Sequence, residues 1–152
     1  MARTLEIVGE RWTLLIVRDA FLGLRRFDEF QRSLGIATNV LTARLEHLTE
    51  AGVMDKRRYQ ERPERYEYTL TDKGRDLHAV VAAMLQWGDR WASPVPPRLL
   101  THRADGGKVG VRVTCEACGE EVERAEVESM PNPALAVVDR NSPLEPGTQL
   151  LA

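Results

Sequence analysis

The stretch from Thr38 to Thr71, TNVLTARLEHLTEAGVMDKRRYQERPERYEYTLT, changes from helical to strand spacing with almost no loop between the two patterns. Its first part repeats leucines at the spacing of one buried helix face, at Leu41, Leu45 and Leu48. Its second part contains two strand-like runs, 53–60 and 65–71, joined by the turn ERPE. A helix followed at once by a hairpin restricts the fold more than any other feature of the chain.

Three helical segments are expected before this stretch. The first carries Leu5 and Val8 on one face and ends at Gly9. The second, RWTLLIVRDAFLG at 11–23, is apolar nearly all round and should be buried, with Trp12 as a core anchor. The third, FDEFQRSLG, ends at a glycine that suits a helix C-terminus.

Polar residues mark where the helices should begin. Asp28 lies three residues before Gln31, the spacing of a capping box. Thr38 should cap the fourth helix, and Thr71 a long last helix over 72–91. The resulting order of four helices, two strands and a helix predicts an α+β fold, a winged helix-turn-helix with a wing of two or three strands.

A change of composition divides the chain of 152 residues. We expect a winged-helix domain over 1–92, followed by the proline-rich linker SPVPP at 93–97. Beyond it, 98–138 reads as a small β-rich unit in which VGVRVTC forms a strand. The polar end, 139–152, should be flexible.

Several classes of protein are disfavoured. The chain opens without a secretory signal, and its longest apolar runs are too short to cross a bilayer. With only two cysteines there is no disulfide framework, so we expect a cytoplasmic, nucleoid-associated protein that does not bind membranes. His47, His78 and His102 have no local partner that forms a catalytic motif, and the sequence therefore favours a non-enzyme.

The face of the Thr38 helix opposite its leucines carries small polar side chains near the helix N-terminus. Thr38, Asn39 and Thr42 offer hydrogen-bonding groups for base edges, and Arg44 lies to one side. The alternative is a plain surface helix. In isolation this face would not decide between them.

The hairpin concentrates arginines: four stand within nine residues, at positions 57, 58, 62 and 65. They could form a solvated turn, because three glutamates are interspersed, or they could contact phosphates or a minor groove. Their position directly after a recognition-type helix favours nucleic acid. We therefore take Arg58, Arg62 and Arg65 as candidate DNA contacts.

Three segments carry a resemblance to a known family: GERWTLLIVRDAFLGLRRFDEF, LTARLEHLTEAGVMDKRRY and ERYEYTLTDKGRDL. Over roughly residues 3–91 the chain resembles the HxlR family of bacterial winged-helix transcription regulators, relatives of the MarR group. The matching positions include the Arg26-Phe27 pair, and Arg26 joins the candidate DNA contacts.

The resemblance implies a homodimer that binds a pseudo-palindromic operator in double-stranded DNA, usually as a repressor and sometimes as an activator. It also implies an interface built from the first helix and the long last helix, here Leu5, Val8, Leu77, Val81, Met84, Leu85 and Trp91. Many members sense oxidants through a cysteine just upstream of the first helix, whereas here none lies in residues 1–114. A winged helix that binds only proteins remains the alternative function.

The segment after the linker holds the only two cysteines, in CEACG. His102, Asp105, Cys115 and Cys118 could together bind zinc, since imidazole, carboxylate and thiolate are all zinc ligands. A metal-free turn is favoured, and no cofactor is expected. A small-molecule effector could bind between the long helix, near Trp87 and Trp91, and this segment; simple packing is the favoured role of both tryptophans.

Overall fold

The protein is described by a computed structural model that covers residues 1–92, 95–96, 98–130 and 132. Its internal contacts divide the chain into two units, Met1–Val111 and Arg112–Ala152. Much of the expected linker, the end of the expected β-rich unit and the whole of 139–152 lie outside the described residues.

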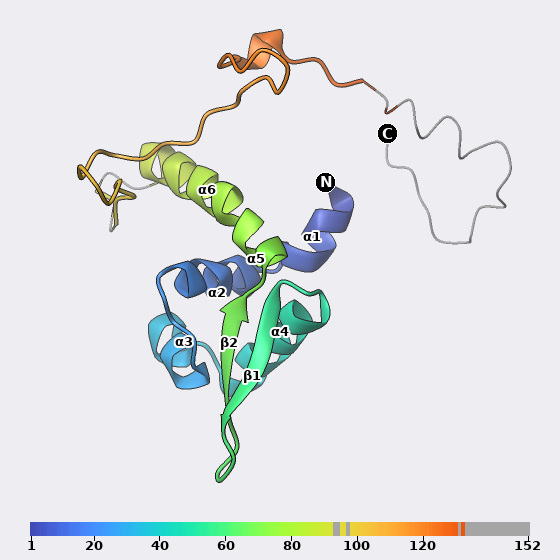
Figure 1. The fold of residues 1–152 in the computed structure, drawn as a ribbon, viewed down its shortest axis with the longest axis vertical. Coiled ribbons are helices and arrows are strands. Elements are labelled where there is room, and N and C mark those ends of the chain that lie inside the picture. The colour runs from blue at the N-terminus through green and yellow to red at the C-terminus, as the bar shows by residue number, and fades with distance from the viewer. Residues whose placement is uncertain (93–94, 97, 131, 133–152) are drawn as a thin grey trace, which may run out of the picture. The chain divides into compact units, whose positions relative to one another are not determined.

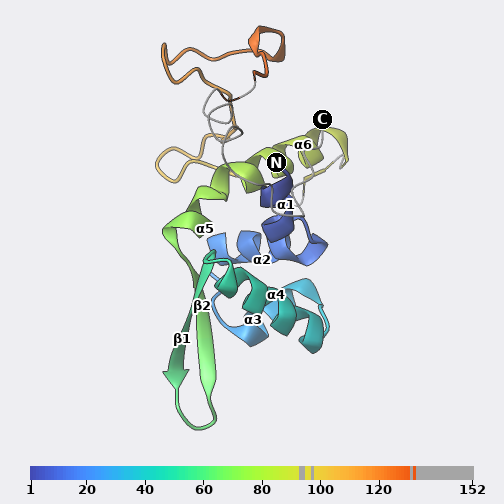
Figure 2. The ribbon, with the colours of Figure 1, turned by 90° about the vertical axis from the view of Figure 1, so that its right-hand side faces the viewer.

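The first unit contains all the helices and strands of a winged helix-turn-helix, in the predicted order (Figure 1). They are α1 (Ala2–Val8), α2 (Arg11–Phe21), α3 (Phe27–Leu34), α4 (Thr38–Glu50), β1 (Met54–Gln60), β2 (Arg65–Leu70), α5 (Asp72–Asp76) and α6 (His78–Trp91). Strands β1 and β2 pair antiparallel, and their hairpin extends well beyond the helices in both views (Figure 2). The prediction of this fold is confirmed. None of the described helices is long and apolar enough to cross a membrane.

The core lies where α2, α3 and α4 meet the sheet. The three leucines of α4 are fully buried, as their spacing predicted, and they belong to one cluster with Ile16 of α2 and Phe30 of α3. Helix α2 is less buried than expected: one face is inaccessible, whereas Trp12 packs against the cluster only in part. Burial of this apolar surface is the main stabilising contribution to the fold.

Two expected caps are wrong, and each is replaced by a neighbour. Helix α3 begins at Phe27, so the carboxylate that reaches back to the free N–H groups is that of Glu29, not Asp28. Helix α4 has Ala37 as its N-cap, and Thr38 is the first helical residue. The N-cap therefore lies two residues earlier than expected in α3, at Arg26, and one residue earlier in α4.

The sheet is tied to the loop before α3. The Tyr68 N–H donates to the Arg25 carbonyl at 2.7 Å, and Arg26 forms a one-residue bridge with Glu67. Between Arg58 and Gln60 the register shifts, so Tyr59 has no direct partner in the ladder. The wing is therefore a two-stranded hairpin, and the one-residue bridge from Arg26 takes the place of a third strand.

One junction connects α4, both strands and α5. The Thr71 hydroxyl donates to the Gly52 carbonyl at 2.7 Å, and its oxygen accepts from the Gly74 N–H at 3.1 Å, which confirms Thr71 as a cap. The Lys73 ammonium donates to the Ala51 carbonyl at 2.6 Å. Gly74 is buried here, and a side chain does not fit because a Cβ would overlap the Val53 carbonyl oxygen.

The expected single helix over 72–91 is interrupted. Leu77 lies between α5 and α6 and is the C-cap of one and the N-cap of the other. The last helical stretch therefore begins with a short separate turn that is fixed to the junction, followed by the longer α6.

The segment after α6 contains turns rather than the expected strands. The described residues of 98–130 form only two isolated bridges, Thr101 with Lys108 and Thr114 with Glu121, and a short 3-10 helix at Arg124–Glu126. The run VGVRVTC contributes a single bridging residue, so the expectation of a strand there is wrong. Val109 and Val113 of this run are exposed, so they bury little apolar surface that could stabilise a strand.

Substitution of Gly74 by alanine should lower the free energy of unfolding by about 2 kcal/mol or more, because the added methyl group collides with backbone. The matched control is Gly88→Ala in α6, where a Cβ meets nothing within 4 Å and helix propensity should stabilise by up to about 1 kcal/mol. Urea denaturation of both variants measures the difference. Equal effects would show that the junction tolerates a side chain.

Candidate nucleic-acid interface

The exposed face of α4 presents hydrogen-bonding groups in its first two turns. Thr38, Asn39 and Thr42 are all exposed, on the opposite side of the helix from the buried leucines. The Thr42 hydroxyl donates to the Thr38 carbonyl at 2.9 Å, which leaves its oxygen free to accept. Asn39 makes no side-chain hydrogen bond to any described residue, so both its donor and its acceptor are available.

The α3–α4 turn holds this face in place. Gly35 adopts a left-handed conformation at φ 60°, which ends α3 and redirects the chain. Across the turn the Gln31 amide donates to the Thr38 hydroxyl oxygen at 2.8 Å. Gln31 thus positions a candidate contact residue, a role that its sequence position did not reveal.

Arg44 does not join the exposed face. Its side chain is only 27% exposed, and its guanidinium lies 3.9 Å from the Glu10 carboxylate. Arg44 therefore connects α4 to the loop between α1 and α2 in this structure.

The arginines of the hairpin fall into two groups. Arg57 pairs with Glu67 at 3.0 Å, and Arg58 lies 3.2 Å from Glu64 and 3.7 Å from Glu61. Arg62 and Arg65, nearest the tip, have no carboxylate partner among the described residues. Their charges are the ones most available to a phosphate.

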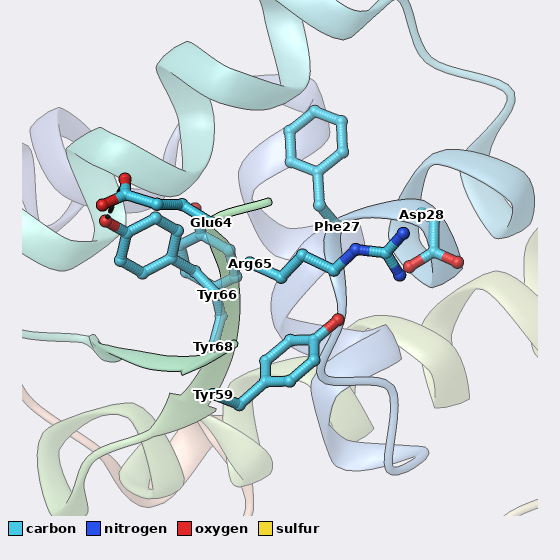
Figure 3. A pocket seen from close by; sticks show the side chains of 7 residues that line it. All are labelled: Phe27, Asp28, Tyr59, Glu64, Arg65, Tyr66 and Tyr68. Carbon is cyan, nitrogen blue, oxygen red and sulfur yellow. Dashed lines mark hydrogen bonds between the residues drawn. The ribbon is translucent and has the colours of Figure 1, made fainter. Parts of the chain in front are cut away.

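A groove of about 370 Å³ lies between the wing and the start of α3 (Figure 3). Arg65 extends across it toward Asp28, with Tyr59 and Phe27 on either side.

Two cation–π contacts hold the wing's aromatic residues. The Arg26 guanidinium lies 4.9 Å from the centre of the Tyr59 ring, and the Lys56 ammonium lies 4.4 Å from that of Tyr66. The Tyr66 hydroxyl also donates to Glu64 at 3.1 Å, and this bond raises the pKa of Tyr66. Arg26 is thus partly engaged in positioning the hairpin.

The Glu29 carboxylate accepts from the backbone N–H groups of Arg25 and Arg26 at 2.8 and 2.9 Å. These two bonds are the main reason that the pKa of Glu29 is lowered. They fix the loop before α3. In this loop the Arg25 carbonyl accepts from the Tyr68 N–H, which ties the wing to α3.

The residues expected at the dimer interface differ in how deeply they are buried. Val8 and Val81 are buried within the single chain, and Leu77 and Leu85 pack against its core. Only Leu5, Met84 and Trp91 are well exposed, at 53%, 55% and 65%.

The candidate metal ligands lie in two turns with the same backbone pattern. In one turn, the His102 N–H donates to the Gly107 carbonyl and the Gly106 N–H donates to the His102 carbonyl. In the other, the Cys115 N–H donates to the Glu120 carbonyl and the Gly119 N–H donates to the Cys115 carbonyl. The His102 imidazole lies 3.1 Å from the Asp105 carboxylate. Backbone N–H groups of Cys118 and Ala117 lower the pKa of the Cys115 thiol. The described residues contain no group of three or more such side chains placed to hold a metal ion.

The two turns share a short sequence pattern. THRADGGK and TCEACGEE align residue for residue. The glycines four residues after His102 and Cys115 are Gly106 and Gly119, and their φ values are 74° and 75°. Three identical positions signal this in the sequence: the flanking threonine, the alanine and the glycine.

A recognition-type helix with free polar groups, held by a tight turn and followed by an arginine-bearing wing, defines a helix-turn-helix DNA-binding protein. The model of the HxlR-like helix-turn-helix family matches residues 7–96, and the chain belongs to that family.

Named relatives agree with this class. The chain is 45% identical to the uncharacterized HTH-type transcriptional regulator Rv3095 of Mycobacterium tuberculosis over 135 residues, which cover 88% of this chain and 85% of Rv3095. The crystal structure of PA1607, described as a putative transcription factor, superposes with a TM-score of 0.76 at 40% identity and covers 86% and 93% of the two chains. PA1374 from Pseudomonas aeruginosa, described in the same words, gives 0.66 at 44% identity, with 88% and 92% covered. These matches extend beyond residue 96, so they include part of the segment after α6.

Replacement of Glu29 by glutamine should reduce stability by about 0.5–1 kcal/mol at pH 7, because a neutral amide is a weaker acceptor for the two N–H groups. A lowered pKa stabilises the fold above the ordinary value of 4.5 and loses this effect as pH falls through the folded value. The gap between parent and variant should therefore close below about pH 4.5. Thermal melts across pH measure it.

Asp28→Asn is the matched control, since that carboxylate lies on the same helix and its one ion pair among the described residues is with Arg32, at 3.6 Å. It should change stability less than Glu29→Gln at every pH. A larger effect at Asp28 would contradict the assignment of the cap.

Proposed function

We propose that this helix-turn-helix transcriptional regulator is a homodimeric repressor that binds a pseudo-palindromic operator in the bacterial cytoplasm. The observation that carries the proposal is the free amide of Asn39 on the exposed first turn of α4, in a chain whose wing tip carries two unpaired arginines. A side-chain amide can bond both edge atoms of adenine in the major groove. Relatives named as transcriptional regulators support a role on DNA.

The residues divide into readers and anchors. Asn39 and Thr42 read bases, since their groups are exposed and not fully used within the protein. Arg62 and Arg65 bind phosphates or the minor groove, because an arginine without a carboxylate partner loses no internal ion pair on binding. Thr38 and Arg58 contribute less, since each already bonds a neighbour, Gln31 and Glu64 respectively.

Dimerisation is supported by the apolar face of α6. Val80, Met84, Trp87 and Trp91 follow helical spacing along one side, and all four are exposed in the single chain. Exposed apolar side chains that line up in this way mark an interface. In the dimer, recognition helices would lie in successive major grooves about 34–36 Å apart.

Asn39→Ala should weaken operator binding by about 1–3 kcal/mol and change binding to random DNA little, because only a base contact is lost. Arg62→Ala should weaken both and reduce the salt slope by about 0.9 for each lost phosphate contact. Titrations at several salt concentrations, on an operator found by genomic footprinting, separate the two effects.

Arg57→Ala is the matched control, because it removes the same charge from the same hairpin at an arginine already paired with Glu67. Its salt slope should change less than that of Arg62→Ala. If Asn39 and Arg62 variants weaken all sequences alike, the assigned roles are incorrect. Binding that is absent at low salt would instead favour a protein-interaction module.

Met84→Glu and Trp91→Glu should yield folded monomers, since both side chains are exposed in the single chain and their burial is intermolecular. Ala79→Glu, exposed on the flank of α6, is the control and should stay dimeric. Val81→Glu should unfold the chain, because Val81 lies in the core. Sedimentation velocity with circular dichroism distinguishes these outcomes. A dimeric Met84→Glu variant with unchanged, two-fold symmetric footprints would place the interface elsewhere.

A further inference from the structure

The exposed face of α4 continues beyond its first turn to Glu46. Asn39, Thr42 and Glu46 are spaced three and four residues apart, so their side chains share one face of the helix. All three are exposed, and Ala43 beside them adds little bulk. What this face can recognise depends on which of its groups still have a hydrogen to donate.

The Thr42 hydroxyl has no hydrogen left for a ligand. It donates to the Thr38 carbonyl at 2.9 Å, and a hydroxyl contains a single hydrogen. Threonine adopts this arrangement readily in a helix, because its hydroxyl reaches the carbonyl four residues back. Rotation of the hydroxyl toward an acceptor on a base would break that bond. The lone pairs of the oxygen remain, so Thr42 is an acceptor only toward DNA.

Glu46 is an acceptor for a different reason. An ionised carboxylate has oxygens but no hydrogen, and Glu46 forms no hydrogen bond or ion pair with any described residue. A carboxylate is repelled by phosphates, so the backbone of DNA is a poor partner for it. Thr42 and Glu46 therefore present only acceptors on the second and third turns of the exposed face.

The first turn of the same face has the opposite property. The Thr38 hydroxyl oxygen accepts from the Gln31 amide at 2.8 Å, so its own hydrogen stays free to donate. The Asn39 amide can donate as well as accept. On this face the donors thus belong to the N-terminal turn of α4, and acceptors alone follow it.

The bases offer few donors in the major groove. These donors are the exocyclic amino groups, N6 of adenine and N4 of cytosine. Guanine and thymine present the carbonyl oxygens O6 and O4 at the corresponding positions. An acceptor on the protein can therefore bond adenine or cytosine, whereas it is repelled by the guanine or thymine that a transition puts in the same place.

We infer that Thr42 and Glu46 select operator positions at which the amino group of adenine or cytosine faces them, and reject the transition at each position. This inference rests on the proposed function and adds to it the identity of the base atoms that are read. Discrimination comes from the direction of the hydrogen bond and not from the shape of the side chain. Valine, which has the shape of threonine, should therefore lose it.

Operators that lack single atoms test this direction. The position read by Thr42 is the one at which Thr42→Val lowers the cost of a transition. There, replacement of adenine by purine, or of cytosine by pyrimidin-2-one, deletes the amino group and should weaken binding of the parent about fivefold. The same deletion should change binding of Thr42→Val by less than about twofold. Thr42→Ser keeps the hydroxyl and should behave as the parent does.

Thr49→Val is the matched control for threonine. The Thr49 hydroxyl donates to the Leu45 carbonyl at 2.7 Å in the same way, but it is partly buried near the other end of α4. This variant should show the full cost of the amino deletion. Glu46→Ala should lower the cost of an amino deletion at its own position, whereas Glu50→Ala, which removes an exposed carboxylate from the last turn, should not.

Deletion of a carbonyl oxygen, by replacement of guanine with 2-aminopurine, gives the opposing result. If Thr42→Val abolishes the cost of that deletion instead, the hydroxyl is a donor and the inferred direction is wrong. Sequence-specific binding in which no position depends on Thr42 would overturn the inference alone, and dependence on Thr42 without dependence on Glu46 would remove Glu46 from it. A parent protein that does not bind duplex DNA at low salt would instead overturn the proposed function.

Discussion

The arrangement of the winged helix depends on one close backbone approach, where Gly74 packs against the Val53 carbonyl. Only the absence of a side chain lets α5 pass this near to the start of β1. The Thr71 hydroxyl, which bonds both the Gly52 and Val53 carbonyls, then fixes the end of β2 to the end of α4. Because the recognition helix and the wing leave from this point, their relative direction is set by short hydrogen bonds rather than by loop length. The interface for DNA is therefore preorganised, and less conformational entropy is lost on binding.

The sequence predicted the parts of this fold that repeat. The leucines of α4 report burial directly and were confirmed, whereas in β2 only Tyr68 is buried and both of its neighbours are partly exposed. Caps were harder, because Asp28 and Glu29 are chemically equivalent and only the entry angle of the chain decides which one reaches the free N–H groups. The break at Leu77 has no breaker residue to signal it. The start of α5 is held by hydrogen bonds to the Ala51 and Val53 carbonyls. Such tertiary contacts cannot be read from a local sequence pattern.

The candidate site was only partly predictable for a similar reason. The sequence indicated a cluster of arginines but not their partners. Arg57 lies opposite Glu67 in the ladder, so the strand register decides that this charge is paired. The register shift beyond Arg58 turns Tyr59 toward Arg26, a contact between residues 33 positions apart in the chain. The buried Asp19 was hidden in an apolar helix, where one acidic residue reads as an exposed interruption of the pattern.

The pairing of half the hairpin arginines has a consequence for how such a protein would search a genome. Binding to arbitrary duplex is driven by the counterions that a protein displaces, and an arginine already neutralised by Glu67 or Glu64 displaces few. A wing with two free arginines instead of four holds bulk chromosomal DNA more weakly. Since non-operator sequence outnumbers the operator by about a millionfold or more, weak residence on bulk DNA leaves a larger share of molecules free to find the target. Internal ion pairs that contribute little to stability thus lower the number of copies a cell needs to keep one promoter occupied.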